Sequence, residues 1–461
     1  MTGIRRRLSP LADRNLRLYF AGAATSLLGS SMSALAVVFA VLHAGGGQSD
    51  LGYVMAARIV PIVAFMLVGG VVADRFGPRR VLLAADVLQC VTQAAFAAAL
   101  LLGRPPIWTF FVFVAIWGIG EGFAMPARGA LVPGVVAWGR QYDGKLRDAN
   151  ALYGLAQSAA TVAGPALAGL LVASAGSGAV ILLDAVTYAL SAVALLLLRL
   201  PAHAAAPVSS GRLAVREGWR EFSSRTWLWV TTLHFTLFNL AVWAPFLVLG
   251  PVVAERDLGG ARDWGLVMAV YGAGALAGGL ALVGGRVLRR PLVVATAATF
   301  GWAVPSAALA AGAPFAVLLA AALVAGIGSA VCSALYATAN QQHVPAEVLA
   351  RVTSLTGMGA FALGPLGLAV AGPAAEAAGT GAVLGFGAVF QVVLGLSVLA
   401  VPAVRRLGAA PDRATAIRLG RARRAGGCAR RAAGGRAGPC PPPLRAPGHA
   451  DPCDERMVHD P

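Results

Sequence analysis

Long apolar runs separated by short polar segments make up most of the 461-residue chain. The runs cover residues 18–43, 51–73, 81–102, 107–125, 149–173 and 178–198, and then 227–250, 264–284, 292–311, 315–337, 352–371 and 381–401. Each run is close to the ~20 apolar residues that cross a ~30 Å hydrocarbon layer as a helix. Because a helix satisfies its own backbone hydrogen bonds in lipid, the pattern predicts an all-α integral membrane protein with about twelve transmembrane helices.

The polar segments between the runs carry most of their basic residues on alternate sides. Arginines are frequent in the N-terminal tail, in the loops after the second, fourth and eighth runs, and in the central loop. The intervening loops 44–50 and 175–178 have no basic residue, whereas Arg104, Arg256 and Arg262 are exceptions to the pattern. Cytoplasmic loops carry an excess of Lys and Arg. We therefore predict a multi-pass protein of the cell (plasma) membrane with both termini in the cytoplasm.

Related features recur in the two parts of the chain, about 200 to 215 residues apart, as expected of an internal repeat. The recurring dipeptides are Val132-Pro133 with Val344-Pro345, and Gly164-Pro165 with Gly364-Pro365. The order of the repeats predicts two pseudo-symmetric six-helix halves. The expected parts are a cytoplasmic N-terminal tail (1–17), an N-terminal half (18–198), a cytoplasmic central loop (199–226), a C-terminal half (227–404) and a basic tail (405–461) whose composition predicts disorder.

Composition excludes several other classes of protein. Only 12% of residues are charged, against about 25% in soluble chains, and 58% are hydrophobic. The net charge of +17 lies largely in short loops and tails, where topology accounts for it, so nucleic acid is not an expected partner. The chain has no Gly-x-x-x-x-Gly-Lys-Ser/Thr phosphate loop and no metal or nucleophile constellation in its spans. We expect no cofactor, no metal and no enzymatic activity; any transport must use an ion gradient or the substrate's own gradient.

A charged hairpin bracketed by glycines joins the second and third runs. Its key residues are Gly70, Asp74, Arg75, Gly77, Arg79 and Arg80. The glycines allow a tight turn, and the basic residues stay in water. The segment resembles the cytoplasmic signature Gly-x-x-x-Asp-Arg-x-Gly-Arg-Arg of the major facilitator superfamily, except that Pro78 takes the first basic position. The resemblance implies the major facilitator fold.

Further segments sharpen this resemblance. Residues 124–133, 148–152, 164–171 and 184–188, with Arg58 in 55–61, look like the macrolide-efflux and enterobactin-exporter branch of that superfamily. The resemblance covers about residues 10 to 405 and implies proton-coupled efflux of drugs or a small secreted metabolite by alternating access, as a monomer in the lipid bilayer. Two alternatives stay open: an uptake or facilitative transporter of the same fold, or a non-transporting membrane sensor or assembly protein.

The hairpin and the fifth run carry two candidate conformational motifs. Asp74 is expected to cap the positive N-terminus of the eleventh span near 351–354, or to pair with Arg128, and so to latch the halves on the inner side. The alternative is that the hairpin only sets topology. Gly164, Pro165 and Gly169 partly resemble the antiporter signature, with Ala160 where that signature has another glycine. The alternative for this motif is plain helix packing.

Two charged residues inside the runs are candidates for proton or substrate contact, because a charge at mid-bilayer costs at least ~2.5–3.5 kcal/mol. Glu121 lies between Gly120 and Gly122, and removal from water favours the protonated form of a carboxyl group. It is the first candidate for a proton carrier; the alternative is a structural pair with Arg128 or another base. Arg58 either holds a substrate anion or an acid, or extends to the outer headgroups.

Other polar residues in the spans are weaker candidates. Asp184 either fixes Arg58, faces an outer cavity or has a structural role, and Asp86 is expected to pair with loop arginines. His234 and Asn239 lie among aromatic residues of the seventh run, where they either contact substrate or protons or simply pack. The fold implied by the resemblance has a cavity between spans one, four, seven and ten. The residues that then line it are Ser26, Ser30, Trp117, Glu121, Asn239, Ser333 and Tyr336.

Overall fold

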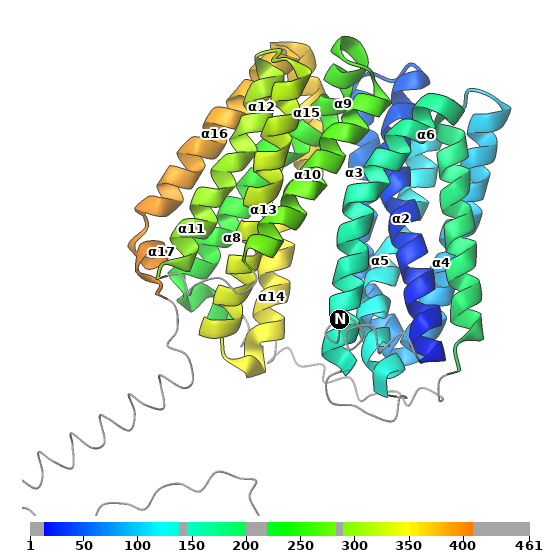
Figure 1. Ribbon diagram of the computed structural model, residues 1–461, viewed down its shortest axis with the longest axis horizontal. Coiled ribbons are helices and arrows are strands. Elements are labelled where there is room, and N and C mark those ends of the chain that lie inside the picture. The colour runs from blue at the N-terminus through cyan, green and yellow to red at the C-terminus, as the bar shows by residue number, and fades with distance from the viewer. Residues whose placement is uncertain (1–12, 138–144, 200–218, 283–288, 409–461) are drawn as a thin grey trace, which may run out of the picture. The chain divides into compact units, whose positions relative to one another are not determined.

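The computed structural model describes residues 13–137, 145–199, 219–282 and 289–408, and the regular elements assigned within them are all helical (Figure 1). The first group of helices is α2 (Arg14–His43), α3 (Gln48–Phe76), α4 (Pro78–Leu102), α5 (Ile107–Ala137) and α6 (Lys145–Leu197). The second group is α8 (Thr226–Phe238), η2 (Asn239–Trp243), α9 (Ala244–Asp257), α10 (Ala261–Ala281), α11 (Pro291–Ala298), η3 (Thr299–Trp302), α12 (Ala303–Ala310), α13 (Phe315–His343), α14 (Ala346–Phe361), α15 (Gly364–Ala378), α16 (Thr380–Ala400) and α17 (Pro402–Arg406). We call these groups the first and the second bundle.

Eleven of the described helical segments are long and apolar enough to cross a membrane. One of them, Leu152–Leu197, has 46 residues and contains a break at Gly176, where φ is 82° and ψ is 163°. That segment holds the fifth and sixth predicted spans, so the predicted set of about twelve spans is confirmed. The seventh and ninth spans contain a short π-helix, η2, and a short 3₁₀ helix, η3, that the apolar pattern did not predict.

Small residues let the helices pack closely within each bundle, and small residues also form the contacts between the two bundles. α6 meets α10, and α3 meets α15. A Cβ atom on Gly265 would lie 2.5 Å from the carbonyl oxygen of Pro165, and a Cβ atom on Gly52 would lie 2.3 Å from that of Leu368. Side chains at these positions would force the backbones apart, because small residues are what allows membrane helices to approach closely. Pro165 and Gly169 of the predicted antiporter-like motif therefore lie in the contact between the bundles.

Polar contacts reinforce this junction at the helix ends that the sequence assigns to the outer side. His43 Nε2 lies 3.4 Å from Glu255 Oε1. The Ser49 hydroxyl donates to Glu376 Oε1 at 2.7 Å. Principal contacts between the bundles come from α2, α3 and α6 on one side and from α9, α10 and α15 on the other. At the opposite end, α14 and α5 lie apart (Figure 1). The described bundles are therefore closed at one end of the helices.

Gly265→Val is expected to open this junction, because its Cβ atom would lie only 2.5 Å from the Pro165 carbonyl oxygen and 2.9 Å from the Gly169 Cα atom. A loss of about 1.4 kcal/mol shifts a two-state equilibrium tenfold. Labelling of Ser49→Cys by a membrane-impermeant maleimide should therefore rise about tenfold. The matched control is Gly279→Val on the same helix, where an added Cβ meets nothing within 4 Å. Equal labelling of folded Gly265→Val and Gly279→Val would contradict the conclusion that close packing at Gly265 keeps the junction between the bundles closed.

Candidate functional site

An acid–base pair lies between α3 and α5 inside the first bundle. Arg58 Nη2 donates to Glu121 Oε2 at 2.8 Å, and the Arg58 guanidinium carbon lies 3.7 Å from the centre of the Trp117 ring. The helices come close enough for this because position 118 is glycine, where a Cβ atom would lie 2.3 Å from the Arg58 carbonyl oxygen. Arg58 and Glu121 are 20% and 25% exposed. Of the bases that the sequence left open for Glu121, the structure selects Arg58.

Hydrogen bonds extend from Trp117, which lies against Arg58, to α2. The Trp117 indole N–H donates to the Tyr188 hydroxyl at 2.9 Å, and that hydroxyl shares a 2.8 Å hydrogen bond with the Ser30 hydroxyl. Both Trp117 and Tyr188 are fully buried. Buried Trp and Tyr usually find a hydrogen-bond partner for their polar tips. Sequence reasoning missed Tyr188 as part of the site, although a tyrosine within an apolar run was the available signal.

A second ion pair lies in the same bundle. Arg128 Nη2 is 3.8 Å from Asp86 Oδ1, and it is also 3.5 Å from the Ser26 hydroxyl. The Ser191 hydroxyl donates to the other Asp86 oxygen at 2.6 Å, and Asp86 has no exposed surface. The expected partners of Asp86 were loop arginines, and this expectation is wrong, because Arg128 belongs to α5. A buried carboxylate needs its charge balanced nearby, which Arg128 provides within the bundle.

Asp184 is held by neutral groups rather than by a cation. Gln93 Nε2 donates to Asp184 Oδ2 at 2.8 Å, and the Thr187 hydroxyl donates to Oδ1 at 3.2 Å. Within the described residues, no Lys or Arg nitrogen lies within 4 Å of this carboxyl group, so the suggested pairing with Arg58 is not formed here. Gly29 on α2 provides the space, since a Cβ atom there would lie 2.5 Å from Oδ1. Of the roles predicted for Asp184, these contacts fit the structural one, in which its carboxyl group joins neighbouring helices.

The charged hairpin turns at Gly77, where φ is 90° and ψ is 134°, a conformation that favours glycine. Arg79 donates from Nε to the carbonyl oxygen of Leu195 at 2.8 Å and from Nη2 to that of Leu196 at 3.0 Å. These are end carbonyls of α6, where a cation is favourable. Arg79 therefore ties the hairpin to α6 within the first bundle.

The other hairpin residues lie at its surface. Asp74, Arg75 and Arg80 are exposed, and Gly70 lies beside Pro126 of α5. The side chain of Arg351 is outside the described residues, so the latch between Asp74 and 351–354 stays a prediction. Gly164 and Gly169 contact α2 and α10, since Cβ atoms there would lie 2.3 Å from the Ser31 hydroxyl and 2.5 Å from the Ala261 carbonyl oxygen.

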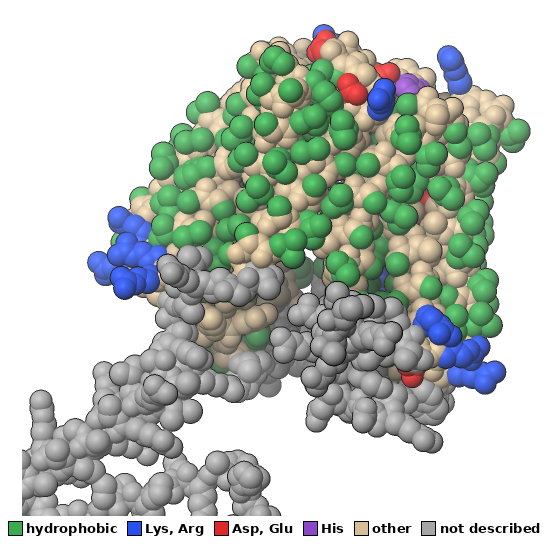
Figure 2. Space-filling view, viewed as in Figure 1, with side chains coloured by type: hydrophobic (Ala, Val, Ile, Leu, Met, Phe, Trp, Pro, Cys, Tyr) green, Lys and Arg blue, Asp and Glu red, His purple; other side chains and the backbone are tan. Residues whose placement is uncertain are grey.

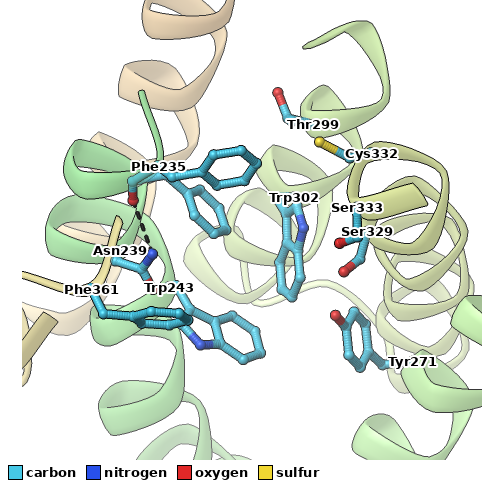
Figure 3. A pocket seen from close by; sticks show the side chains of 11 residues that line it. Phe235, Asn239, Trp243, Tyr271, Thr299, Trp302, Ser329, Cys332, Ser333 and Phe361 are labelled. Atoms are coloured by element: carbon cyan, nitrogen blue, oxygen red, sulfur yellow. Dashed lines mark hydrogen bonds between the residues drawn. The ribbon is translucent and has the colours of Figure 1, made fainter. Parts of the chain in front are cut away.

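A cavity of about 230 Å³ lies in the second bundle (Figure 3). Among the described residues its lining is aromatic or small and polar, without a charged side chain: Phe235, Phe238, Asn239, Trp243, Tyr271, Thr299, Trp302, Ser329, Cys332, Ser333 and Phe361. The Trp243 and Trp302 rings are 4.4 Å apart at 76°, and the Tyr271 ring lies 4.9 Å from Trp302. Pockets of this composition take apolar molecules and orient them by a few polar groups.

Both irregular helix segments end at this cavity. Trp243 is the last residue of the π-helix η2, and Trp302 is the last residue of the 3₁₀ helix η3. Asn239 begins η2 and donates from Nδ2 to the carbonyl oxygen of Phe235 at 2.9 Å (Figure 3). It also donates to the carbonyl oxygen of Ala360 at 3.2 Å. Single-turn π segments are often found at functional sites. The two tryptophans that meet in the cavity are thus the last residues of the two irregular segments.

Of the candidate residues predicted in the second half of the chain, some line the cavity and others do not. Asn239 and Ser333 line the cavity. His234 does not: it is 1% exposed, packs edge-on against Phe235 at 5.6 Å, and has no hydrogen bond from either ring nitrogen to the described residues. Tyr336 also packs against Phe235, at 5.2 Å. This cavity is walled by spans seven to eleven, and the cavity predicted between spans one, four, seven and ten stays a prediction.

The chain matches the sequence model of the Major Facilitator Superfamily over residues 19–368. The multidrug efflux pump Tap of Mycolicibacterium fortuitum is 26% identical over 403 residues, which are 85% of this chain and 97% of the relative. Tap of Mycobacterium tuberculosis is 29% identical over 413 residues, 83% and 92% of the two chains. Macrolide efflux protein A of Streptococcus pyogenes is 23% identical over 355 residues, 76% and 86% of the two chains.

Solved structures show the same fold. The nucleoside transporter NupG superposes with a TM-score of 0.66 at 14% identity, covering 84% of this chain and 98% of that one. A bacterial homologue of the human lysosomal transporter Spinster, in an inward-facing and unoccupied conformation, superposes with a TM-score of 0.64 at 14% identity, covering 86% and 98%. At these identities the likeness concerns the fold alone.

Proposed function

This chain belongs to the major facilitator superfamily, and we propose that it exports small organic molecules in exchange for protons. It is a multi-pass membrane protein whose fold and relatives are those of transporters rather than enzymes. The similarity to proteins named as multidrug and macrolide efflux pumps supports the direction of transport. The proposal takes the monomer as the working unit and places both termini in the cytoplasm.

One observation carries the proposal: an uncharged aromatic cavity in one bundle is separate from a partly exposed acid–base pair in the other. The cavity around Trp243 and Trp302 suits flat apolar molecules, because aromatic rings stack and also attract cations through their faces. The pair of Arg58 and Glu121 suits proton exchange, because both side chains retain exposed surface. A proton that binds Glu121 removes the charge that holds Arg58, so binding of a proton changes the contact between α3 and α5.

Alternating access then follows from the junction between the bundles. Contacts such as Gly265 with Pro165 and Ser49 with Glu376 close the predicted outer end. Release of substrate to the outside requires these contacts to part, while the inner ends approach. A ligand shifts a conformational equilibrium only if it binds the two conformations with different free energies. Here the ligand is the proton that binds Glu121, and the two conformations are those closed at the outer end and closed at the inner end.

The experiment uses inverted membrane vesicles that contain the full chain and a fluorescent lipophilic cation as probe. With the lumen acidified, we expect the probe to accumulate inside, and a protonophore to abolish the accumulation. Vesicles without the protein serve as the control. Gradient-driven movement of the probe in the opposite direction would support the uptake alternative. Probe movement that equals the control, for this cation and for a macrolide, would contradict proton-coupled efflux.

A further inference from the structure

Four arginines surround a hollow at one end of the second bundle. The hollow encloses about 500 Å³, and its lining residues are Arg289, Arg290, Pro402, Arg405, Arg406 and Gly408. Arg289 and Arg290 precede α11, whereas Arg405 and Arg406 end α17, so two segments more than a hundred residues apart bring their basic side chains together. Figure 2 shows basic side chains gathered at this end of the bundle, where Figure 1 places α17.

The four guanidinium groups have no acidic partner among the residues that the structure describes. None of the ion pairs found there includes them, in contrast to Arg225, which pairs with Glu221, and Arg128, which pairs with Asp86. Within the described part of the chain, Arg405 Nη2 donates to the carbonyl oxygen of Ala400 at 2.9 Å. Like charges that converge on one hollow repel each other, and an anion placed between them removes that repulsion.

The location of the hollow restricts which anion it takes. The loop between α10 and α11 and the end of α17 lie on the side that the arginine pattern assigns to the cytoplasm. The adjoining helices α11 and α16 present exposed apolar side chains, including Val294, Val389, Val393 and Leu396. The basic hollow thus borders a surface suited to lipid acyl chains. A ligand with an anionic head and apolar tails satisfies both features, and a soluble anion satisfies only one.

We propose that this hollow binds the phosphate headgroup of an anionic phospholipid of the inner leaflet. Guanidinium groups bind phosphate oxygens in a bidentate manner, and basic pockets between transmembrane helices on the cytoplasmic side suit such headgroups. The α11 N-terminus, with Pro291 as its first residue, adds the positive end of a helix to the same place. The bound lipid links the ends of α11 and α17 and stabilises the second bundle.

The test measures binding of lipids to the purified full-length chain by native mass spectrometry and thermal unfolding. We expect phosphatidylglycerol or cardiolipin to bind at least about tenfold more tightly than phosphatidylcholine, and to raise the unfolding temperature. Arg289→Gln with Arg405→Gln should remove this preference. If that double variant fails to fold, Arg290→Gln with Arg406→Gln replaces it.

The matched control is Arg104→Gln with Arg262→Gln, which removes the same charge from exposed positions on the predicted outer side. The control should keep the preference for anionic lipid. Equal preference in the hollow variants and the wild type would overturn the proposal, and so would the absence of any preference over phosphatidylcholine in the wild type. An equal stabilisation by inorganic phosphate alone would overturn it in favour of a soluble anion. None of these outcomes depends on whether the chain transports drugs.

Discussion

Glu121→Gln is expected to abolish proton-driven export while leaving probe binding close to that of the wild type. Glutamine keeps the size of the side chain and a hydrogen bond to Arg58, but it cannot carry the proton whose arrival releases Arg58. In inverted vesicles with an acid lumen, gradient-dependent uptake of the fluorescent cation should fall at least about tenfold, which corresponds to ~1.4 kcal/mol of lost coupling free energy. Binding of the same probe to purified protein should change little, because Glu121 does not line the aromatic cavity.

A second glutamate–arginine pair provides the matched control. Glu221, in the helical residues 219–224, pairs with Arg225, the residue before α8, outside the spans and at 26% and 29% exposure. Glu221→Gln removes the same charge and the same kind of pair, and ion pairs near the surface contribute only about 0–1 kcal/mol. It should therefore transport like the wild type. Full gradient-driven transport by Glu121→Gln would show that this carboxyl group does not carry the proton, and Asp184 would become the next residue to test.

Trp243→Ala is expected to weaken probe binding ten- to a hundredfold. The Trp243 ring forms one wall of the cavity, and its nearest aromatic neighbour is Trp302 at 4.4 Å. Truncation of a central aromatic residue in a binding site commonly costs about 2 kcal/mol or more, and each 1.4 kcal/mol is tenfold in affinity. Fluorescence titration of the probe into purified protein measures the loss. Trp243→Phe keeps a ring and should recover most of the affinity.

Trp108→Ala is the control for this substitution. Trp108 is 65% exposed near the start of α5 and lies outside the cavity, so its loss should leave probe affinity unchanged. Thermal unfolding of each variant separates a binding effect from a folding defect. Unchanged affinity in a folded Trp243→Ala variant would place the substrate elsewhere, for instance between the bundles, as the sequence suggested. If Trp243→Ala lowers the affinity for the probe but keeps proton-driven transport, the proposal that Glu121 couples transport to protons stands.

Residue types alone predicted several members of the candidate site but not which of them pair. Charges within apolar spans are costly, so Arg58, Glu121 and Asp184 stood out from the sequence as residues with a specific partner or role, whereas Arg128 was named only as a possible partner of Asp74 or Glu121. Their pairing did not follow from the sequence. Glu121 is 63 positions from Arg58, and the choice between Arg58 and Arg128 depends on which helices touch. The glycine at position 118 settles this, because it brings α5 against the backbone of α3.

The aromatic cavity was largely missed for a related reason. Asn239 and Ser333 were candidates for contact with substrate, whereas Trp243 was one of the aromatic residues of the seventh run for which packing was the alternative, and Tyr271 and Trp302 were not predicted to line a site. Apolar spans that are hydrophobic all round carry no amphipathic signal from which to tell the buried face. The π-helix that ends at Trp243 and the 3₁₀ helix that ends at Trp302 have no clear signature in the apolar pattern.

The sequence by itself determined that this chain crosses a membrane about twelve times and belongs with the transporters, because apolar length and a glycine-bracketed charged hairpin are local properties of the chain. Only the tertiary structure decided that Arg58 holds Glu121, that Arg128 rather than a loop arginine balances Asp86, and that an aromatic cavity lies within the second bundle. These features are contacts between helices far apart in sequence. Their geometry is set by close packing at particular glycines and by helix irregularities, which the hydrophobic pattern does not encode.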